Sequence, residues 1–116
     1  MTALASKIIN PSNAYLVRQE WRKYDPATNT FPLWSGATGT ITLAEDSAGS
    51  TVITGFNALA LSASTTGVYY RILTAAETAN LASYDGDTIY QIVVGGSNNE
   101  LRVVTPLVVT VPRTAP

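Results

Sequence analysis

The sequence GVYYRILTAAETANLASYDGDTIYQIVV, residues 67–94, contains two strand-like runs on either side of a short helical segment. The runs Val68–Leu73 and Thr88–Val94 are rich in β-branched and aromatic residues, which fit the pleated surface of a β-sheet. Both faces of the second run are mostly apolar, so we expect it to be a central strand. This stretch therefore predicts a strand, a helical crossing and a second strand.

The helical crossing begins with the spacing of a capping box. The Thr74 hydroxyl can accept a hydrogen bond from a free backbone N–H of the first turn, and Glu77 can reach back to the N–H of the cap residue. Residues 75–82 contain good helix formers, but a helix of about two turns is marginal alone. We therefore expect packing to hold it in place, with Leu81 as the anchor.

The first run alternates between two faces, as side chains of a strand do. Because a charged side chain favours water or a partner, Arg71 predicts that its face is exposed and that Tyr69 forms a surface pair with it. The two faces are Val68, Tyr70 and Ile72 on one side, and Tyr69, Arg71 and Leu73 on the other.

Further short strands are expected throughout the chain. Turns separate them, such as Asp25–Asn29, in which Pro26 sets φ and Asn29 tolerates a left-handed conformation. Pro106 lies within a strand-like run, which implies a sheet edge or a bulge. About seven to nine short strands, spaced roughly eight to twelve residues apart, favour a sandwich or a barrel. The additional expected ranges are Tyr15–Trp21, Phe31–Trp34, Thr38–Ala44, Thr51–Thr54, Ala58–Ser62, Glu100–Thr105 and Leu107–Val111.

Length and composition indicate one domain that binds other proteins. A chain of 116 residues supports a single core. Charged residues make up 13%, about half of the usual share of roughly 25%. Because interface cores are poor in charge, we expect assembly, including a homo-oligomer. The net charge of −1 and the lack of a basic tract argue against a nucleic-acid partner.

The chain lacks the residue types that most often carry chemistry. With no Cys and no His, it has no disulfide, no thiolate nucleophile, no zinc site of the Cys/His kind and no histidine base. We therefore expect neither an enzyme nor a cofactor. The first residues lack the features of a signal peptide, and no apolar run approaches the ~20 residues of a membrane span, so we expect no membrane partner.

Two acidic pairs are candidate sites. Asp85 and Asp87 offer oxygens to Ca²⁺, but calcium needs six to eight ligands and a turn is the ordinary explanation. Glu45 and Asp46 lack a second carboxylate placed for glycoside hydrolysis. We expect no metal site and no catalytic residue.

The N-terminal arm, residues 1–13, leaves two alternatives open. Ile8 and Ile9, followed by Pro11, either plug into a neighbouring subunit or form an edge strand of their own fold. The aromatic residues are similarly ambiguous between a contact platform for sugar or protein and ordinary core packing. They are Tyr15, Trp21, Tyr24, Trp34, Tyr69 and Tyr70.

The strand, crossing and strand of residues 67–94 resemble the passage between the two sheets of an immunoglobulin-like sandwich, where a Tyr ties down the corner. Tyr84 or Tyr90 would take that part. The resemblance implies an all-β, antiparallel sandwich over residues 14–111, with one short helix between late strands and a C-terminal tail of residues 112–116.

More specifically, three motifs together resemble the small immunoglobulin-like modules of tailed-bacteriophage virion proteins: Ala37–Leu43, Gly67–Ile72 and Tyr84–Ile92. The resemblance implies a non-catalytic structural role in the virion. The leading expectation is a capsid decoration (cement) protein that binds other virion subunits through sheet edges and terminal arms. Alternatives are a baseplate or tail-fibre attachment module and, from another class, a carbohydrate-binding module. The expected partner-binding residues are Ile8, Ile9, Pro11, Trp34, Tyr69 and Arg71.

Overall fold

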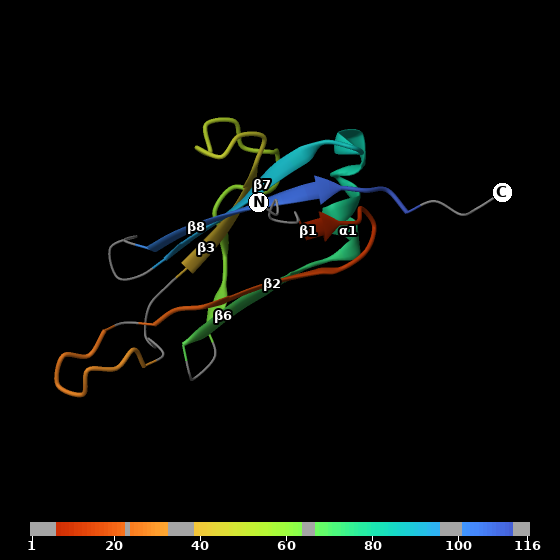
Figure 1. The fold of residues 1–116 in the computed structure, drawn as a ribbon. Helices are drawn as coiled ribbons and strands as arrows, with labels where there is room; N and C mark the ends of the chain where they lie inside the picture. The colour runs from red at the N-terminus through yellow and green to blue at the C-terminus, as the bar shows by residue number, and fades with distance from the viewer. Residues whose placement is uncertain (1–6, 23, 33–38, 64–66, 96–100, 113–116) are drawn as a thin grey trace, which may run out of the picture.

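The described part of the chain folds into two β-sheets, a short α-helix and a 3₁₀ turn. The computed structural model describes residues 7–22, 24–32, 39–63, 67–95 and 101–112. One sheet has five strands in the order β1-β8-β7-β3-β4, and the other has three in the order β2-β6-β5 (Figure 1). The strands are β1 (Lys7–Ile9), β2 (Tyr15–Glu20), β3 (Gly39–Ala44), β4 (Leu59–Ala60), β5 (Ser62–Ala63), β6 (Val68–Leu73), β7 (Thr88–Gly95) and β8 (Leu101–Val109).

The central stretch folds largely as its sequence predicts. β6 leads into α1 (Ala75–Ala79), a 3₁₀ turn follows at Ala82–Tyr84, and β7 then lies between β8 and β3. The prediction of a mostly β chain with one short helix between late strands is confirmed. The helix is shorter than predicted, because Asn80 ends it and the chain tightens into the 3₁₀ turn while fully buried Leu81 anchors the segment.

Both sheets contribute to a single hydrophobic core. Val17, Tyr69 and Leu73 come from the three-stranded sheet, while Leu43 and Val93 come from the five-stranded sheet. The alternation predicted for Tyr15–Trp21 is confirmed, since Val17 and Trp21 are buried and the intervening even-numbered residues are exposed. The strand predicted at Thr51–Thr54 is reduced to an isolated bridge between Ala44 and Val52.

The two faces of β6 are the reverse of the prediction. Tyr69 and Leu73 point into the core, whereas Tyr70 and Ile72 are exposed. The expected surface pair of Tyr69 and Arg71 is therefore wrong. The aromatic ring of Tyr69 packs against the Trp21 ring, with 4.7 Å between centroids. The free energy gained by burying the Tyr69 ring and Leu73 exceeds the cost of placing the Arg71 guanidinium at the margin of the core, where polar contacts stabilise it.

Residues 7–9 take the edge-strand alternative. β1 pairs in parallel with β8, from Lys7 beside Leu107 to Ile9 beside Val109. This makes the five-stranded sheet mixed rather than wholly antiparallel as predicted. The Ile9 side chain is fully buried in its own subunit, and this burial explains why the segment stays on the sheet.

β8 runs through Pro106 without interruption. The Val109 N–H donates to the Asp87 carbonyl, so odd-numbered residues of β8 direct their N–H groups toward β7 and even-numbered residues direct theirs away. The nitrogen of Pro106 is therefore on the side of β8 away from β7, so its missing N–H costs no bond to β7. The pairing of β8 with β7 continues through Pro106 without a bulge, and β8 is the second strand of its sheet, with β1 beside it from Leu107 onward.

A pair of glycines makes room for Trp21. Gly39 of β3 and Gly95 of β7 are register partners. A Cβ atom added to Gly95 would lie 1.7 Å from the nearest carbon of the indole ring, and one added to Gly39 would lie 2.9 Å from it. The absence of both side chains thus allows the indole to lie directly on the backbone of the five-stranded sheet.

Candidate interaction surfaces

The described part of the chain offers surfaces rather than a cleft. Among its residues there is no pocket and no cluster of three or more His, Cys, Asp or Glu side chains able to hold a metal. Two of the candidate acidic residues, Asp85 and Asp46, accept backbone hydrogen bonds in loops. Asp85 Oδ1 accepts the Val111 N–H at 2.9 Å. Asp46 accepts the backbone N–H groups of Thr51 and Ser50, and these bonds lower the pKa of its carboxyl group.

The outer face of the three-stranded sheet carries an apolar surface. Leu16 of β2 and Ile72 of β6 are direct cross-strand partners, and 56% and 57% of their surfaces are exposed. Tyr70 lies two positions from Ile72 on the same face and is also exposed. We call these three residues the outer patch. Side chains this apolar gain free energy when a partner covers them, so the outer patch is a candidate contact surface.

Charged residues border the outer patch on β2. Arg18 is the register partner of Tyr70, and its guanidinium forms an ion pair of 2.8 Å with Glu20. Both side chains are half-exposed, so this pair contributes little to folding stability. Its two opposite charges leave the border of the patch with no net charge.

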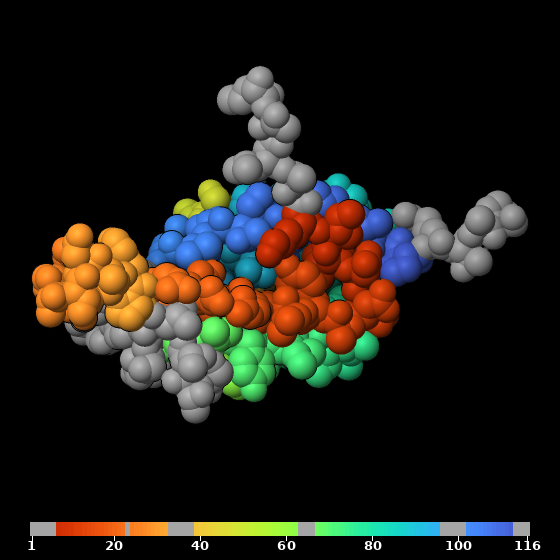
Figure 2. Space-filling model, turned by 60° about the horizontal axis from the view of Figure 1, so that its bottom comes forward, coloured from red at the N-terminus to blue at the C-terminus, as the bar shows by residue number. Residues whose placement is uncertain are grey.

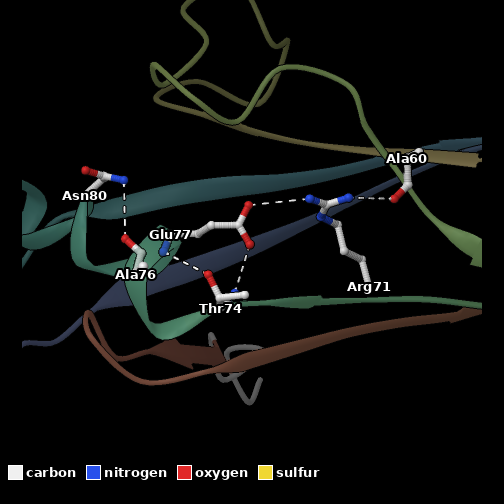
Figure 3. Close-up of polar contacts among 6 residues, drawn as sticks. All are labelled: Ala60, Arg71, Thr74, Ala76, Glu77 and Asn80. Carbon is white, nitrogen blue, oxygen red and sulfur yellow. Dashed lines mark hydrogen bonds and ion pairs between the residues drawn. The ribbon is translucent and has the colours of Figure 1, made fainter.

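Arg71 lies on the other side of β6, in a polar network at the margin of the core (Figure 3). Its guanidinium donates to the Ala60 carbonyl at 3.1 Å and forms an ion pair of 3.5 Å with Glu77. The Glu77 carboxylate also accepts the Thr74 N–H at 2.9 Å, which completes the predicted capping box. That hydrogen bond and the charge of Arg71 lower the pKa of Glu77. Arg71 thus ties the helix to β4.

Tyr84, one of the two tyrosines expected at the corner, is the last residue of the 3₁₀ turn and packs against the core. Burial raises the pKa of its phenol, and the nearby Glu45 carboxylate raises it further. Tyr15 shows the same effect of burial on its pKa. Both phenols therefore stay neutral to higher pH than an exposed tyrosine.

The residues predicted to bind a partner do not form one surface. Ile8 is exposed on β1, but Ile9 and Pro11 are buried within their own subunit. Tyr69 is in the core and the contacts of Arg71 described above are internal. Trp34 lies outside the described residues.

Of the outer patch, only Tyr70 was a candidate contact residue from the sequence; Leu16 and Ile72 were not predicted. One signal for it was present, because Leu16 shares a face of β2 with the charged residues Arg18 and Glu20. An apolar residue on a strand face that otherwise carries charged residues indicates a surface for contact with a partner. Ile72 gave no comparable signal, since its exposure depends on which face of β6 meets the core.

No helix in the described ranges is long and apolar enough to span a membrane. Comparison of the chain with protein-family models, with curated proteins and with solved structures gives no match.

Proposed function

We propose that the chain is a non-catalytic structural protein of a bacteriophage particle, and specifically a capsid decoration protein. The observation that carries this proposal is the outer patch, where Leu16, Tyr70 and Ile72 leave large apolar surfaces in water on an otherwise sparsely charged small protein. Such surface is useful to a protein that works by contact with other polypeptides.

The strand order supports the immunoglobulin-like part of the proposal. In such sandwiches, strands B, E and D lie in one sheet and strands C, F and G in the other. The order β2-β6-β5 matches the first set, and the order β8-β7-β3 matches the second read from its G strand. The helical segment between β6 and β7 then lies at the connection from strand E to strand F.

The outer patch supplies a contact of moderate strength. Covering three side chains that are each about half-exposed contributes on the order of 3 kcal/mol. Association also costs translational and rotational freedom, so a patch of this size does not hold an isolated pair of molecules together. It does suit a protein that binds many equivalent positions of a lattice and uses further contacts at its edges.

One such edge is that of β8. Arg102 and Val104 are at even-numbered positions, so their backbone N–H groups point away from β7. Among the described residues, β1 pairs with β8 from Leu107 to Val109. An extended segment of a neighbouring subunit would pair with β8 near Arg102 and Val104 by backbone hydrogen bonding.

The test is to locate the chain in purified phage particles. Antibodies against the purified chain, applied with gold labels to intact particles, would mark the capsid if it is a decoration protein. Labelling of the baseplate or fibres would instead favour the attachment module. Particles that contain none of this chain by mass spectrometry would refute both forms of the proposal.

A further inference from the structure

The first and last strands of the fold lie side by side and run in the same direction. β1 pairs in parallel with β8, with Ile9 beside Val109, and the arrows of the two strands point the same way in Figure 1. In the space-filling view, the first described residues (red) lie against the last ones (blue) (Figure 2). The chain therefore enters β1 at Lys7, at one end of this pair, and leaves β8 after Val109, at the opposite end.

This arrangement determines how a pulling force acts on the fold. A force that draws the two ends of the chain apart pulls β1 toward Lys7 and β8 toward Val109, so the strands are driven to slide past each other. Backbone hydrogen bonds between parallel strands are evenly spaced, so sliding loads them together. Because side chains alternate between faces, the next register that keeps Ile9 on the core side is two residues away, about 7 Å.

β1 is held at the strand itself and behind it. The Thr110 N–H donates to the Ile9 carbonyl at 3.1 Å, and the Ile9 side chain is fully buried. The loop that follows β1 is fixed to the helix, because the buried Thr78 hydroxyl donates to the Asn13 carbonyl at 2.7 Å. Sliding β1 out must therefore break its backbone bonds and expose Ile9 in the same movement.

β8 is held along its length and beyond it. It pairs with β7 from Leu101 to Val108. The Val109 N–H then donates to the Asp87 carbonyl at 2.9 Å. Further along, the Val111 N–H donates to Asp85 Oδ1, also at 2.9 Å. These bonds keep β8 in the sheet, so under a force between the two ends the shorter pairing of β1 with β8 gives way first.

We propose that β1 and β8 form a shear clamp, through which the protein resists a pulling force applied between the two ends of its chain. A force that separates the same strands sideways would break their bonds one after another, so the resistance depends on the direction of pulling. The clamp is a property of the fold, and it neither requires nor restates the proposed function. In a decoration protein it would keep two subunits linked under tension when each holds one end of the chain.

Single-molecule force spectroscopy of the full chain tests the clamp. The sequence contains no Cys, so added cysteines define the attachment points. One protein has a cysteine added at each end of the chain. The other has Ala14→Cys, at an exposed position after β1, and the same C-terminal cysteine, so that both attachments lie where β8 ends. We expect the first geometry to unfold at about twice the force of the second or more, because shear loads the bonds together. Equal forces would overturn the clamp.

Two proline variants test which bonds resist the force. Because the Ile9 carbonyl faces β8 and residues alternate along a strand, the Lys7 N–H also faces β8 and the Ile8 N–H faces away. Both side chains are exposed, so neither substitution alters the core. We expect Lys7→Pro to unfold about fivefold faster at a given force, the factor for one lost hydrogen bond. The matched control, Ile8→Pro, should unfold within about twofold of the unaltered chain.

Equal unfolding rates for the two proline variants would also overturn the clamp. The comparison of pulling geometries leaves both strands unaltered, so it tests the clamp independently of how the proline variants fold. Neither measurement involves a phage particle. A particle that lacks this chain would therefore remove the proposed function and leave the clamp in place, whereas equal forces in the two geometries would do the opposite.

Discussion

Replacing Gly95 by Ala tests how the two sheets fit together. The new Cβ would lie 1.7 Å from the Trp21 ring, where ordinary contacts are about 3.4–4 Å, so the ring would have to move by about 2 Å. It has little room to do so, because Tyr69 packs against it and Gly39 lies beside it. Overpacking of this kind costs about 3 kcal/mol, at the upper end of the usual range.

The loss of a flexible glycine offsets part of that cost. Ala in place of Gly within a strand contributes roughly 0.5–1 kcal/mol through the unfolded state, which leaves a net destabilisation of about 2 kcal/mol. For a domain of this size we expect the melting temperature to fall by about 8 °C. Gly39→Ala is the control. Its Cβ would be 2.9 Å from the ring, which is a smaller conflict, and the gain from replacing a strand glycine by Ala nearly cancels the cost of that conflict.

Thermal and urea unfolding of both variants, followed by circular dichroism, measure the melting temperature and the unfolding free energy. The double variant Gly95→Ala with Trp21→Phe adds a second measurement, because a smaller ring leaves space for the methyl group and the two substitutions should be less than additive. A Gly95→Ala protein as stable as the unaltered chain, or one no less stable than Gly39→Ala, would refute this account of the packing.

Three further outcomes are expected. Thr74→Ala should lower the unfolding free energy by about 1 kcal/mol in urea titrations by removing the helix cap, and an unchanged midpoint would contradict this role. The pKa values of Asp46 and Glu77 are lowered in the folded protein, so the stability they contribute is present above their ordinary values of 3.8 and 4.5 and is lost as the pH falls through the folded pKa values. Melting temperatures measured from pH 6 to pH 2 should therefore fall mainly below about pH 4.5, and a flat profile would contradict it. Leu16→Ser with Ile72→Ser should weaken particle binding by about 2 kcal/mol, roughly 30-fold, with little change in melting temperature. Undiminished occupancy would remove the outer patch from the contact.

Local patterns predicted most of the elements correctly. The capping box of Thr74 and Glu77, the anchor at Leu81 and the turn at Asn29 depend on residues close in sequence, and all three form as predicted. The apolar character of both faces of β7 likewise indicated its central position, because a strand between two neighbours inside a layered fold is covered on both sides.

The sequence was a poorer guide to which side chains are exposed. Alternation in β6 separated its residues into two sets, but a period of two does not say which set faces the core. The ring of Tyr69 could be buried only because Trp21 lies on Gly39 and Gly95, and these four residues are far apart in the chain. Their packing turned Tyr70 and Ile72 outward and thereby created the outer patch.

The amino-acid sequence by itself determined that this chain is a small, sparsely charged, mostly β protein with one capped helical turn between its later strands. Only the tertiary structure decided which faces are buried, that Ile9 belongs to its own sheet, and that Leu16 and Ile72 are exposed side by side. Hydrogen bonds within turns and caps join neighbouring residues and can be read along the chain, whereas burial depends on contacts between distant segments, which form only when the whole chain has folded.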